Sequence, residues 1–333
     1  MTQIKSILLD KRPIGLPKLS DFSTVKEEVP EVAEGNILLK LKYASVDPYL
    51  RGRMNDVKSY IPPFELGRPI VSGGVAEVLD SRHADFKQGD FVSGMMAWKE
   101  IQTSKGEGLY KVDPNLAPLS AYLGVLGLTG LTAYLGLTEI GKPKKGETLV
   151  VSGAAGAVGS IVGQLGKLLG LKVIGTAGSD EKVAMLTDKF GFDKGINYNT
   201  TENMVDALKT ACPDGIDIYW DNVGGKVSEA VLFNINKFAR LIQCGAISIY
   251  NETQPSTSIP VHTFLIRKSA LMQGFIVFDY EAKYPEAIKA LSEWLRAGKL
   301  NHAETIREGF EALPQAFIDL FHGKNVGKML VQM

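Results

Sequence analysis

Residues 150–160, Val-Val-Ser-Gly-Ala-Ala-Gly-Ala-Val-Gly-Ser, decide the fold, because an aliphatic run ends there in a glycine-dense turn. We expect a buried strand over Thr148–Val151 and a helix over Ser160–Leu169. Gly156 would let a ligand approach the backbone, and Gly159 would let the helix pack on the strand. A helix start presents unpaired N–H groups and the positive end of its dipole, so this turn is typical of a phosphate site.

The alternation of strands and helices continues for about 150 residues after this turn. The expected strands are Lys172–Thr176, Gly195–Tyr198, Ile216–Asp221, Ala239–Cys244 and Leu271–Val277, and the expected helices are Asp180–Phe190, Met204–Cys212, Val227–Phe238 and Tyr284–Ala297. Such βαβ units predict an α/β fold, a doubly wound parallel sheet of Rossmann type. This context supports the phosphate turn even though Ala154 stands where the usual G-x-G-x-x-G fingerprint has its first glycine.

The first 120 residues have a different pattern, with short apolar runs between Gly, Pro and Asp turns and no long helices. The runs are Ile37–Lys42, Ile70–Leu79 and Phe91–Val92. Gly73 and Gly74 lie inside one run and predict a bulge or a tight bend. We expect a mostly antiparallel, partly open β-barrel over residues 1–120, to which residues 301–333 return, and a Rossmann domain over residues 121–300.

Composition narrows the class of protein. The 37 Lys and Arg residues balance the 37 Asp and Glu residues. The sequence contains no block of basic residues of the kind that binds along a nucleic-acid backbone. No apolar run reaches the length of a membrane span, and Met1–Lys5 leads into polar sequence rather than a signal peptide. The two cysteines imply no disulfide framework. We therefore expect a cytoplasmic protein with neither a nucleic-acid nor a membrane partner.

The second strand of the Rossmann pattern bears on which dinucleotide binds. It runs into Ala177–Ser179 without the carboxylate that usually accepts the ribose hydroxyls of NAD. Lys182 follows in the next helix, well placed for a 2′-phosphate, although a solvated surface lysine is the ordinary alternative. The neighbouring Asp180 and Glu181 complicate the charge argument as N-terminal helix acids. On balance the pattern favours NADPH.

A metal is not predicted. A catalytic zinc needs three protein ligands, and a structural zinc commonly needs four cysteines. The candidates are scattered without ligand spacing: His83, His262, His302, His322, Cys212 and Cys244.

Several segments, in order along nearly the whole chain, carry a resemblance to a known family. They are Ser45–Arg51 (SVDPYLR), Gly127–Tyr134 (GLTGLTAY), Ala154–Gly159 (AAGAVG), Gly178–Lys182 (GSDEK), Asp221–Gly225 (DNVGG), Cys244–Asn251 (CGAISIYN) and Asn325–Lys328 (NVGK). In these the chain resembles the zinc-free medium-chain dehydrogenase/reductase superfamily, in the branch of prostaglandin reductase (leukotriene B4 12-hydroxydehydrogenase) and plant double-bond reductases. The resemblance implies a GroES-like substrate domain, NADPH as cofactor, and reduction of the C=C bond of α,β-unsaturated aldehydes and ketones.

The resemblance also implies a set of cofactor-binding residues. They are Ala155, Gly156, Ala157, Val158 and Gly159 in the turn, Lys182 at the 2′-phosphate, Tyr198 at the adenosine ribose, Asn222, the segment Cys244, Gly245, Ala246, Ile247, Ser248 and Tyr250, then Phe275, Ile276 and Val277 facing the nicotinamide, and Asn325. Taken singly, several of these have ordinary structural explanations. Tyr198 would be a packing residue, Asn222 and Asn325 turn formers, and Cys244 a core residue.

For catalysis, the resemblance implies that Tyr250 is the proton donor, while an aromatic lid over the cofactor is an equal alternative. Tyr49 would line the substrate side. Two other functions stay open: an NADPH-dependent quinone reductase of the same superfamily, and a non-enzymatic NADPH-binding sensor. A small-molecule enal, enone or quinone is the expected partner. We also expect a homodimer joined at sheet edges near Ala270–Met272, as in the family.

Overall fold

The computed structural model describes residues 3–333, which form two compact units. Unit 1 runs to Leu123 and also contains Glu304–Asn325 and Met329–Met333. Unit 2 contains Gly124–Ala303 and Val326–Lys328. The C-terminal part of the chain is therefore divided between the two units.

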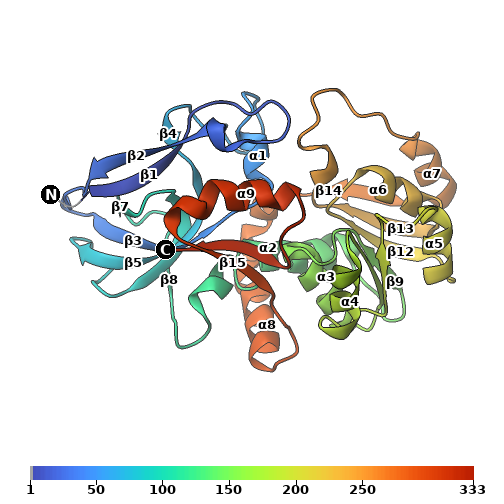
Figure 1. Cartoon of the computed structure of the whole chain (residues 1–333). Helices are drawn as coiled ribbons and strands as arrows, with labels where there is room; N and C mark the ends of the chain where they lie inside the picture. Colours follow the sequence, from blue (N-terminus) through green and yellow to red (C-terminus); the bar gives the residue numbers. More distant parts are fainter. Residues whose placement is uncertain (1–2) are drawn as a thin grey trace. The chain divides into compact units, whose positions relative to one another are not determined.

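Unit 2 is built on a six-stranded parallel sheet (Figure 1). Its strands are β9 (Thr148–Val151), β10 (Lys172–Ala177), β11 (Lys194–Asn197), β12 (Ile216–Asp221), β13 (Ile235–Gln243) and β14 (Leu271–Gly274). Their order is β11-β10-β9-β12-β13-β14. The strand order thus reverses between β9 and β12, and in doubly wound sheets ligands bind at the carboxyl ends of the strands at such a switch point. The Rossmann prediction is confirmed.

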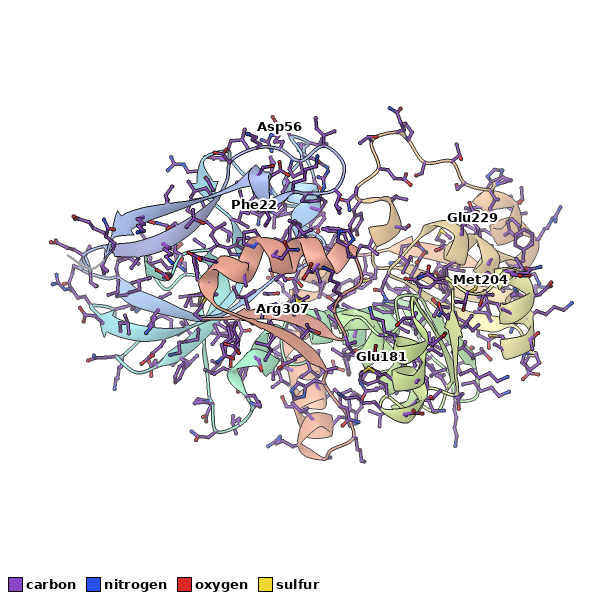
Figure 2. All side chains as sticks on the ribbon, in the orientation of Figure 1. Phe22, Asp56, Glu181, Met204, Glu229 and Arg307 are labelled. Atoms are coloured by element: carbon purple, nitrogen blue, oxygen red, sulfur yellow. The ribbon has the colours of Figure 1, made fainter. Side chains whose placement is uncertain are left out.

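Helices cover both faces of this sheet. The helices of unit 2 are α2 (Leu128–Leu135), α3 (Ala157–Leu168), α4 (Asp180–Asp188), α5 (Met204–Ala211), α6 (Gly225–Leu232), α7 (Val261–Lys268) and α8 (Tyr284–Arg296), with shorter helical turns at Gly136–Gly141 and Val277–Lys283. Among them, α2 and α8 pack on each other. The α3 helix packs tightly on one face, where a Cβ on Gly166 would lie 2.7 Å from Leu149. On the other face, α5 and α6, which carry Met204 and Glu229 in Figure 2, enclose an apolar cluster with β9, β12 and β13.

One predicted helix is wrong at its C-terminal end. The expected helix over Val227–Phe238 ends at Leu232, and the strand β13 already begins at Ile235, four residues before its expected start. Valines and isoleucine at 227, 231 and 235 follow a helical period, which explains the error. The register changes from Ile216↔Ile235 to Ile218↔Arg240, so a bulge in β13 takes up the extra residues. Phe238 in this bulge has φ of 65° and is 63% exposed.

A second correction concerns the last strand. The expected strand over Leu271–Val277 ends at Gly274, and Val277 begins a short helical turn. The other elements expected in unit 2 are present, with ends that differ by a few residues. Helix α3, for example, begins at Ala157 rather than Ser160.

Unit 1 is a separate, antiparallel β structure in every pairing whose register is defined. Its strands are β1 (Gln3–Leu9), β2 (Phe22–Glu28), β3 (Ile37–Ser45), β4 (Arg68–Pro69), β5 (Val71–Ser81), β6 (Phe91–Ala97), β7 (Ile101–Ser104), β8 (Tyr110–Val112), β15 (Glu304–Glu308) and β16 (Lys328–Gln332), and its α-helices are α1 (Leu50–Arg53) and α9 (Leu313–Phe321). Phe22, labelled in Figure 2, stacks on Trp98 with ring centroids 6.4 Å apart and meets Phe317 edge-on. These aromatic rings belong to the main core of the unit.

The glycine pair in β5 does not form the expected bulge. Gly73 and Gly74 pair in regular register with Met95 and Gly94. The pairing of β3 with β5 is irregular at two other places, between Leu41 and Tyr43 of β3 and between Val78 and Asp80 of β5. A Cβ on Gly74 would lie 2.9 Å from the sulfur of Met96, so this glycine permits close packing.

None of the helices within residues 3–333 has the length and apolar character needed to cross a bilayer.

Candidate functional site

The glycine turn after β9 is shaped by contacts between its own backbone atoms. Gly156 is the N-cap of α3, and its N–H donates to the carbonyl of Gly153, which has φ of 57°. A Cβ on Gly159 would lie 2.5 Å from the Gly153 oxygen and 2.9 Å from the Cα of Ala154. Only glycine therefore lets the helix approach the turn this closely, which is the role that the sequence predicted for Gly159.

This turn fits a pyrophosphate. No side chain caps the start of α3, so none competes with an anion for the N–H groups of the first turn, which include those of Ala157 and Val158. The carbonyl of Ala155 accepts the N–H of Gly327 at 2.7 Å, and Gly156 and Gly327 form a parallel bridge. Asn325 lies two positions before Gly327 in the sequence and belongs to unit 1.

Two predicted cofactor-binding residues, Lys182 for the 2′-phosphate and Tyr198 for the adenosine ribose, follow the ends of β10 and β11. A Cβ on Gly178 would lie 2.6 Å from the hydroxyl of Tyr198, so the tyrosine lies over this glycine. Lys182 is half-buried in the first turn of α4, and burial lowers the pKa of its ammonium group. Asp180 accepts a hydrogen bond from the Asn197 amide at 2.7 Å. Asp180 is thus held by the residue at the end of β11.

At the switch point, Asn222 connects the ends of β9 and β12. Its side-chain amide donates to the carbonyl of Ser152 at 2.7 Å, and its side-chain oxygen accepts from the indole of Trp220 at 3.0 Å. Its backbone N–H donates to the Ser152 hydroxyl at 2.9 Å. Asn222 therefore has a structural role at the carboxyl edge of the sheet, beside the glycine turn.

The segment Cys244–Tyr250 is held against the end of β12 by backbone hydrogen bonds. The N–H groups of Cys244 and Gly245 donate to the carbonyl of Asp221 at 2.9 and 3.0 Å. Within the segment, the hydroxyl of Tyr250 accepts the N–H of Ala246 at 3.1 Å. Burial raises the pKa of Tyr250 above its usual value near 10, so the hydroxyl is protonated at neutral pH and keeps its own proton to donate. Burial likewise raises the pKa of the Cys244 thiol to about 12.

Phe275, Ile276 and Val277 follow directly on β14. The ring of Phe275 meets Trp220 edge-on, with centroids 5.9 Å apart. Ile276 is extended, with φ of −114° and ψ of 126°, and Val277 is buried. The chain is thus extended at Ile276, just beyond the carboxyl end of β14.

Tyr49 belongs to unit 1, where it is the N-cap of α1 and packs against the main core. Burial raises the pKa of its hydroxyl well above the usual value. The neighbouring Arg51 is buried, and its guanidinium donates to the carbonyls of Pro13 and Gly15 at 3.2 and 3.1 Å. Arg51 therefore clamps this loop to α1.

Hydrogen bonds in unit 2 bring together the glycine turn, Asn222 and the Cys244–Tyr250 segment, while Lys182 and Tyr198 lie at the adjacent end of β10. Sequence reasoning missed Ser228, and it quoted Ser152, Asp221 and Gly327 only as parts of longer motifs, without a role of their own. A signal was available at Asp221, because an acidic residue at the end of a buried strand needs hydrogen-bond or ion-pair partners. The partner of Gly327, the Ala155 carbonyl, could not be read from the local sequence. Across residues 3–333, no three His, Cys, Asp or Glu side chains are grouped so that they could hold a metal ion.

Comparison with known proteins places these features in a family. Residues 5–112 match the family described as the N-terminal domain of oxidoreductase, and residues 157–293 match the family described as zinc-binding dehydrogenase. The NADP-dependent 2-alkenal reductase of Nicotiana tabacum is 44% identical over 337 residues, which cover 99% of this chain and 97% of the relative. The chain belongs to the medium-chain dehydrogenase/reductase superfamily.

Two further comparisons define the branch. Prostaglandin reductase 1 of Bos taurus is 43% identical over 336 residues, and the match covers all of both chains. The crystal structure of CurA from Vibrio vulnificus in complex with NADPH is 43% identical, with a TM-score of 0.94 and 99% of each chain covered. The resemblance stated from the sequence motifs is confirmed.

Proposed function

We propose that this chain is an NADPH-dependent reductase of the C=C bond of α,β-unsaturated aldehydes and ketones. The observation that carries the proposal is the Tyr250 hydroxyl, which accepts a backbone hydrogen bond at 3.1 Å and so has its proton available for a substrate oxygen. The similarity to a 2-alkenal reductase and a prostaglandin reductase supports the same substrate class.

In this proposal unit 2 binds NADPH and unit 1, with Tyr49, contributes the substrate side. The glycine turn with Gly156 holds the pyrophosphate, and Lys182 with Tyr198 holds the 2′-phosphate end. Asn222, the Cys244–Tyr250 segment, residues 275–277 and Asn325 line the rest of the cofactor. The uncapped start of α3 and the absence of a carboxylate at the end of β10 support this assignment.

When bound, NADPH supplies the hydride that reaches the carbon β to the carbonyl. Negative charge then builds on the carbonyl oxygen as an enolate, which the neutral Tyr250 hydroxyl stabilises by donating a hydrogen bond or a proton. Uptake of one proton from solvent, which ends on the α-carbon, completes the saturated product. The N–H of Ala246 fixes the direction of this hydroxyl. Because the pKa of Tyr250 is raised, the tyrosine acts as a donor across the neutral range.

The direct test follows the absorbance of NADPH at 340 nm with a panel of 2-alkenals, enones and 1,4-quinones. We expect higher kcat/KM on the enals and enones, with loss of the C=C bond in the product. Preference for the quinones would favour the quinone reductase of the same superfamily. NADPH binding without consumption on any of them would favour the non-enzymatic sensor.

The role of Tyr250 is tested separately. Tyr250→Phe removes the hydroxyl, and we expect turnover on an enone to fall about 10²-fold, the lower end of general acid catalysis, with near-normal NADPH affinity. Tyr122→Phe is the matched control, because Tyr122 belongs to unit 1, where its hydroxyl donates to the Asp113 carbonyl. Undiminished turnover in the Tyr250 variant would leave this tyrosine as a lid only.

We also propose a homodimer formed through the β14 edge. This strand is at the end of the sheet order, and Leu271 on it is 47% exposed. Ile266 on the adjacent α7 is 76% exposed. An open apolar edge strand is a ready surface for pairing with a second copy. Light scattering after gel filtration should give twice the chain mass, and Leu271→Lys should shift it to the monomer.

A further inference from the structure

The carboxylate of Asp221 is buried at the end of β12 with only neutral partners. The residue is 1% exposed. One oxygen accepts the Ser152 hydroxyl at 2.9 Å and the N–H groups of Val223 and Gly224 at 3.0 and 2.9 Å. The other oxygen accepts the hydroxyl of Ser228. No Lys or Arg of residues 3–333 forms an ion pair with it, and the four converging donors satisfy its two buried oxygens instead.

The first consequence of these bonds is the shape of the turn after β12. Two of the donors are consecutive backbone N–H groups, so the carboxylate fixes the path of residues 222–225 from inside. Gly224 and Gly225 have φ of 74° and 59°, a conformation that the turn holds only with glycine. A Cβ on Gly224 would lie 3.3 Å from the Cβ of Ala246, so the turn packs closely against the Tyr250 segment.

The second consequence is the position of that segment, because the turn supplies its hydrogen-bond acceptors. The carbonyl of Asn222 accepts the N–H of Ile247 at 3.2 Å. The carbonyl of Val223 accepts both the N–H of Ser248, at 3.0 Å, and the Ser248 hydroxyl, at 2.5 Å. A continuous set of hydrogen bonds thus leads from the Asp221 carboxylate through the turn to the loop that carries Tyr250.

We propose that Asp221 is a positioning residue for the reaction, because its carboxylate shapes the 222–225 turn and thereby sets where the Tyr250 hydroxyl stands. The role in catalysis rests on the proposed function. A carboxylate suits this position because it accepts from all four donors and carries no hydrogen that would oppose any of them. Asp221 acts through backbone geometry and does not touch the substrate.

Two substitutions separate geometry from charge. In Asp221→Asn, the amide oxygen can still accept from Ser152, Val223 and Gly224, and the amide nitrogen can donate to the Ser228 hydroxyl, which also accepts. In Asp221→Ala, the four donors lose their acceptor. Asp214→Asn is the matched control, because Asp214 is exposed and pairs with Lys172 on the surface.

Hydrogen–deuterium exchange and steady-state kinetics provide independent readouts. For Asp221→Ala we expect exchange at least about tenfold faster in residues 222–225 and 244–250 but not in α4. We expect kcat on an enone to fall about 10²-fold, the effect of a misplacement near 1 Å. Asp221→Asn should restore both to within about fivefold of wild type, by keeping its hydrogen bonds.

If Asp221→Ala does not fold, Ser248→Ala replaces it, because this exposed side chain loses only its bond to Val223. We then expect faster exchange confined to residues 246–250 and a fall in kcat of about threefold to tenfold, for one lost hydrogen bond.

Three results would overturn the proposal. The first is unchanged exchange in residues 244–250 of the Asp221→Ala variant, or of Ser248→Ala where that replaces it. The second is unchanged kcat in the same variant. The third is an Asp221→Asn variant as impaired as Asp221→Ala, because charge rather than geometry would then be the cause. A wild-type protein that turns over no enone would instead refute the proposed function, and the exchange experiment would still decide whether Asp221 positions the loop.

Discussion

Replacing Gly159 by alanine should separate the phosphate turn from the helix that follows it. The new methyl group would lie 2.5 Å from the Gly153 oxygen and 2.9 Å from the Ala154 Cα, and both are backbone atoms. Since favourable contacts begin near 3.5 Å, the turn and the start of α3 must move apart by about 1 Å. The turn has no flexible side chain at this point to absorb the shift.

The cost can be estimated from this geometry. Overpacking of this kind costs about 1–3 kcal/mol, and alanine returns up to about 1 kcal/mol through its higher helix propensity. We expect the free energy of unfolding to fall by about 1–2 kcal/mol. The displaced N–H groups should weaken NADPH by about 1.4–2.8 kcal/mol, which is a tenfold to hundredfold rise in Kd.

Gly166→Ala is the matched control on the same helix. Its methyl group would meet side-chain atoms of Leu149 and Val173 at 2.7 and 2.9 Å, against the sheet rather than the turn. Urea unfolding should show a comparable loss of stability in both variants, while titration of NADPH fluorescence should show weakened binding only in Gly159→Ala. Normal affinity in Gly159→Ala, or equal weakening in Gly166→Ala, would refute the assignment of the turn to the pyrophosphate.

Three further outcomes are expected. Lys182→Ala should raise the Kd for NADPH about tenfold or more and leave the Kd for NADH unchanged, because a charge-assisted contact to the 2′-phosphate is lost. Equal effects on both coenzymes in a fluorescence titration would contradict this role of Lys182. Turnover limited by the neutral Tyr250 hydroxyl should stay level up to about pH 9 and fall only as pH rises through its raised pKa, whereas a fall centred near pH 7 would assign that titration to another group. Burial raises the pKa values of Cys212 and Cys244 from 9.0 to about 11 and about 12. Both thiols should therefore react with iodoacetamide at pH 8 far more slowly in the native protein than in guanidinium. The native state also holds these protons more tightly than the unfolded state, so the free energy of unfolding should fall as pH rises above about 9.

The sheet of unit 2 was largely predictable because each buried strand ends in a residue that breaks the pattern. The strand Ile216–Asp221 has the predicted bounds, since the run begins after Gly215 and stops at an acid. The helix predicted to Phe238 overran because the helical period continued by chance into β13, and only the pairing of Ile235 with Ile216 reveals a strand there. In unit 1, β1 and β16 were not predicted, because partners far away in the sequence, such as Phe22–Glu28 for β1 and Tyr43–Ser45 for β16, define them.

The site residues likewise divide into those that the local sequence marks and those that only the folded structure reveals. Lys182 and the glycine turn could be predicted as cofactor-binding because their chemistry is local, within a few residues of a strand end. Asp221 was quoted only as one letter of a motif, because its role depends on donors from three separate segments, at Ser152, at Val223 and Gly224, and at Ser228. Such a role is a property of the folded structure rather than of a spacing in the sequence.

The hydrogen bond from Gly327 to Ala155 joins positions 172 residues apart, since 327 minus 155 is 172. The nucleotide-binding unit is therefore completed only when almost the entire polypeptide has been synthesised. A chain released before Val326 would leave the Ala155 carbonyl without this donor, whatever the state of its parallel sheet. Cofactor capture should accordingly be a late event in biosynthesis, and a premature stop near the C-terminus should perturb the glycine turn as directly as a substitution within it.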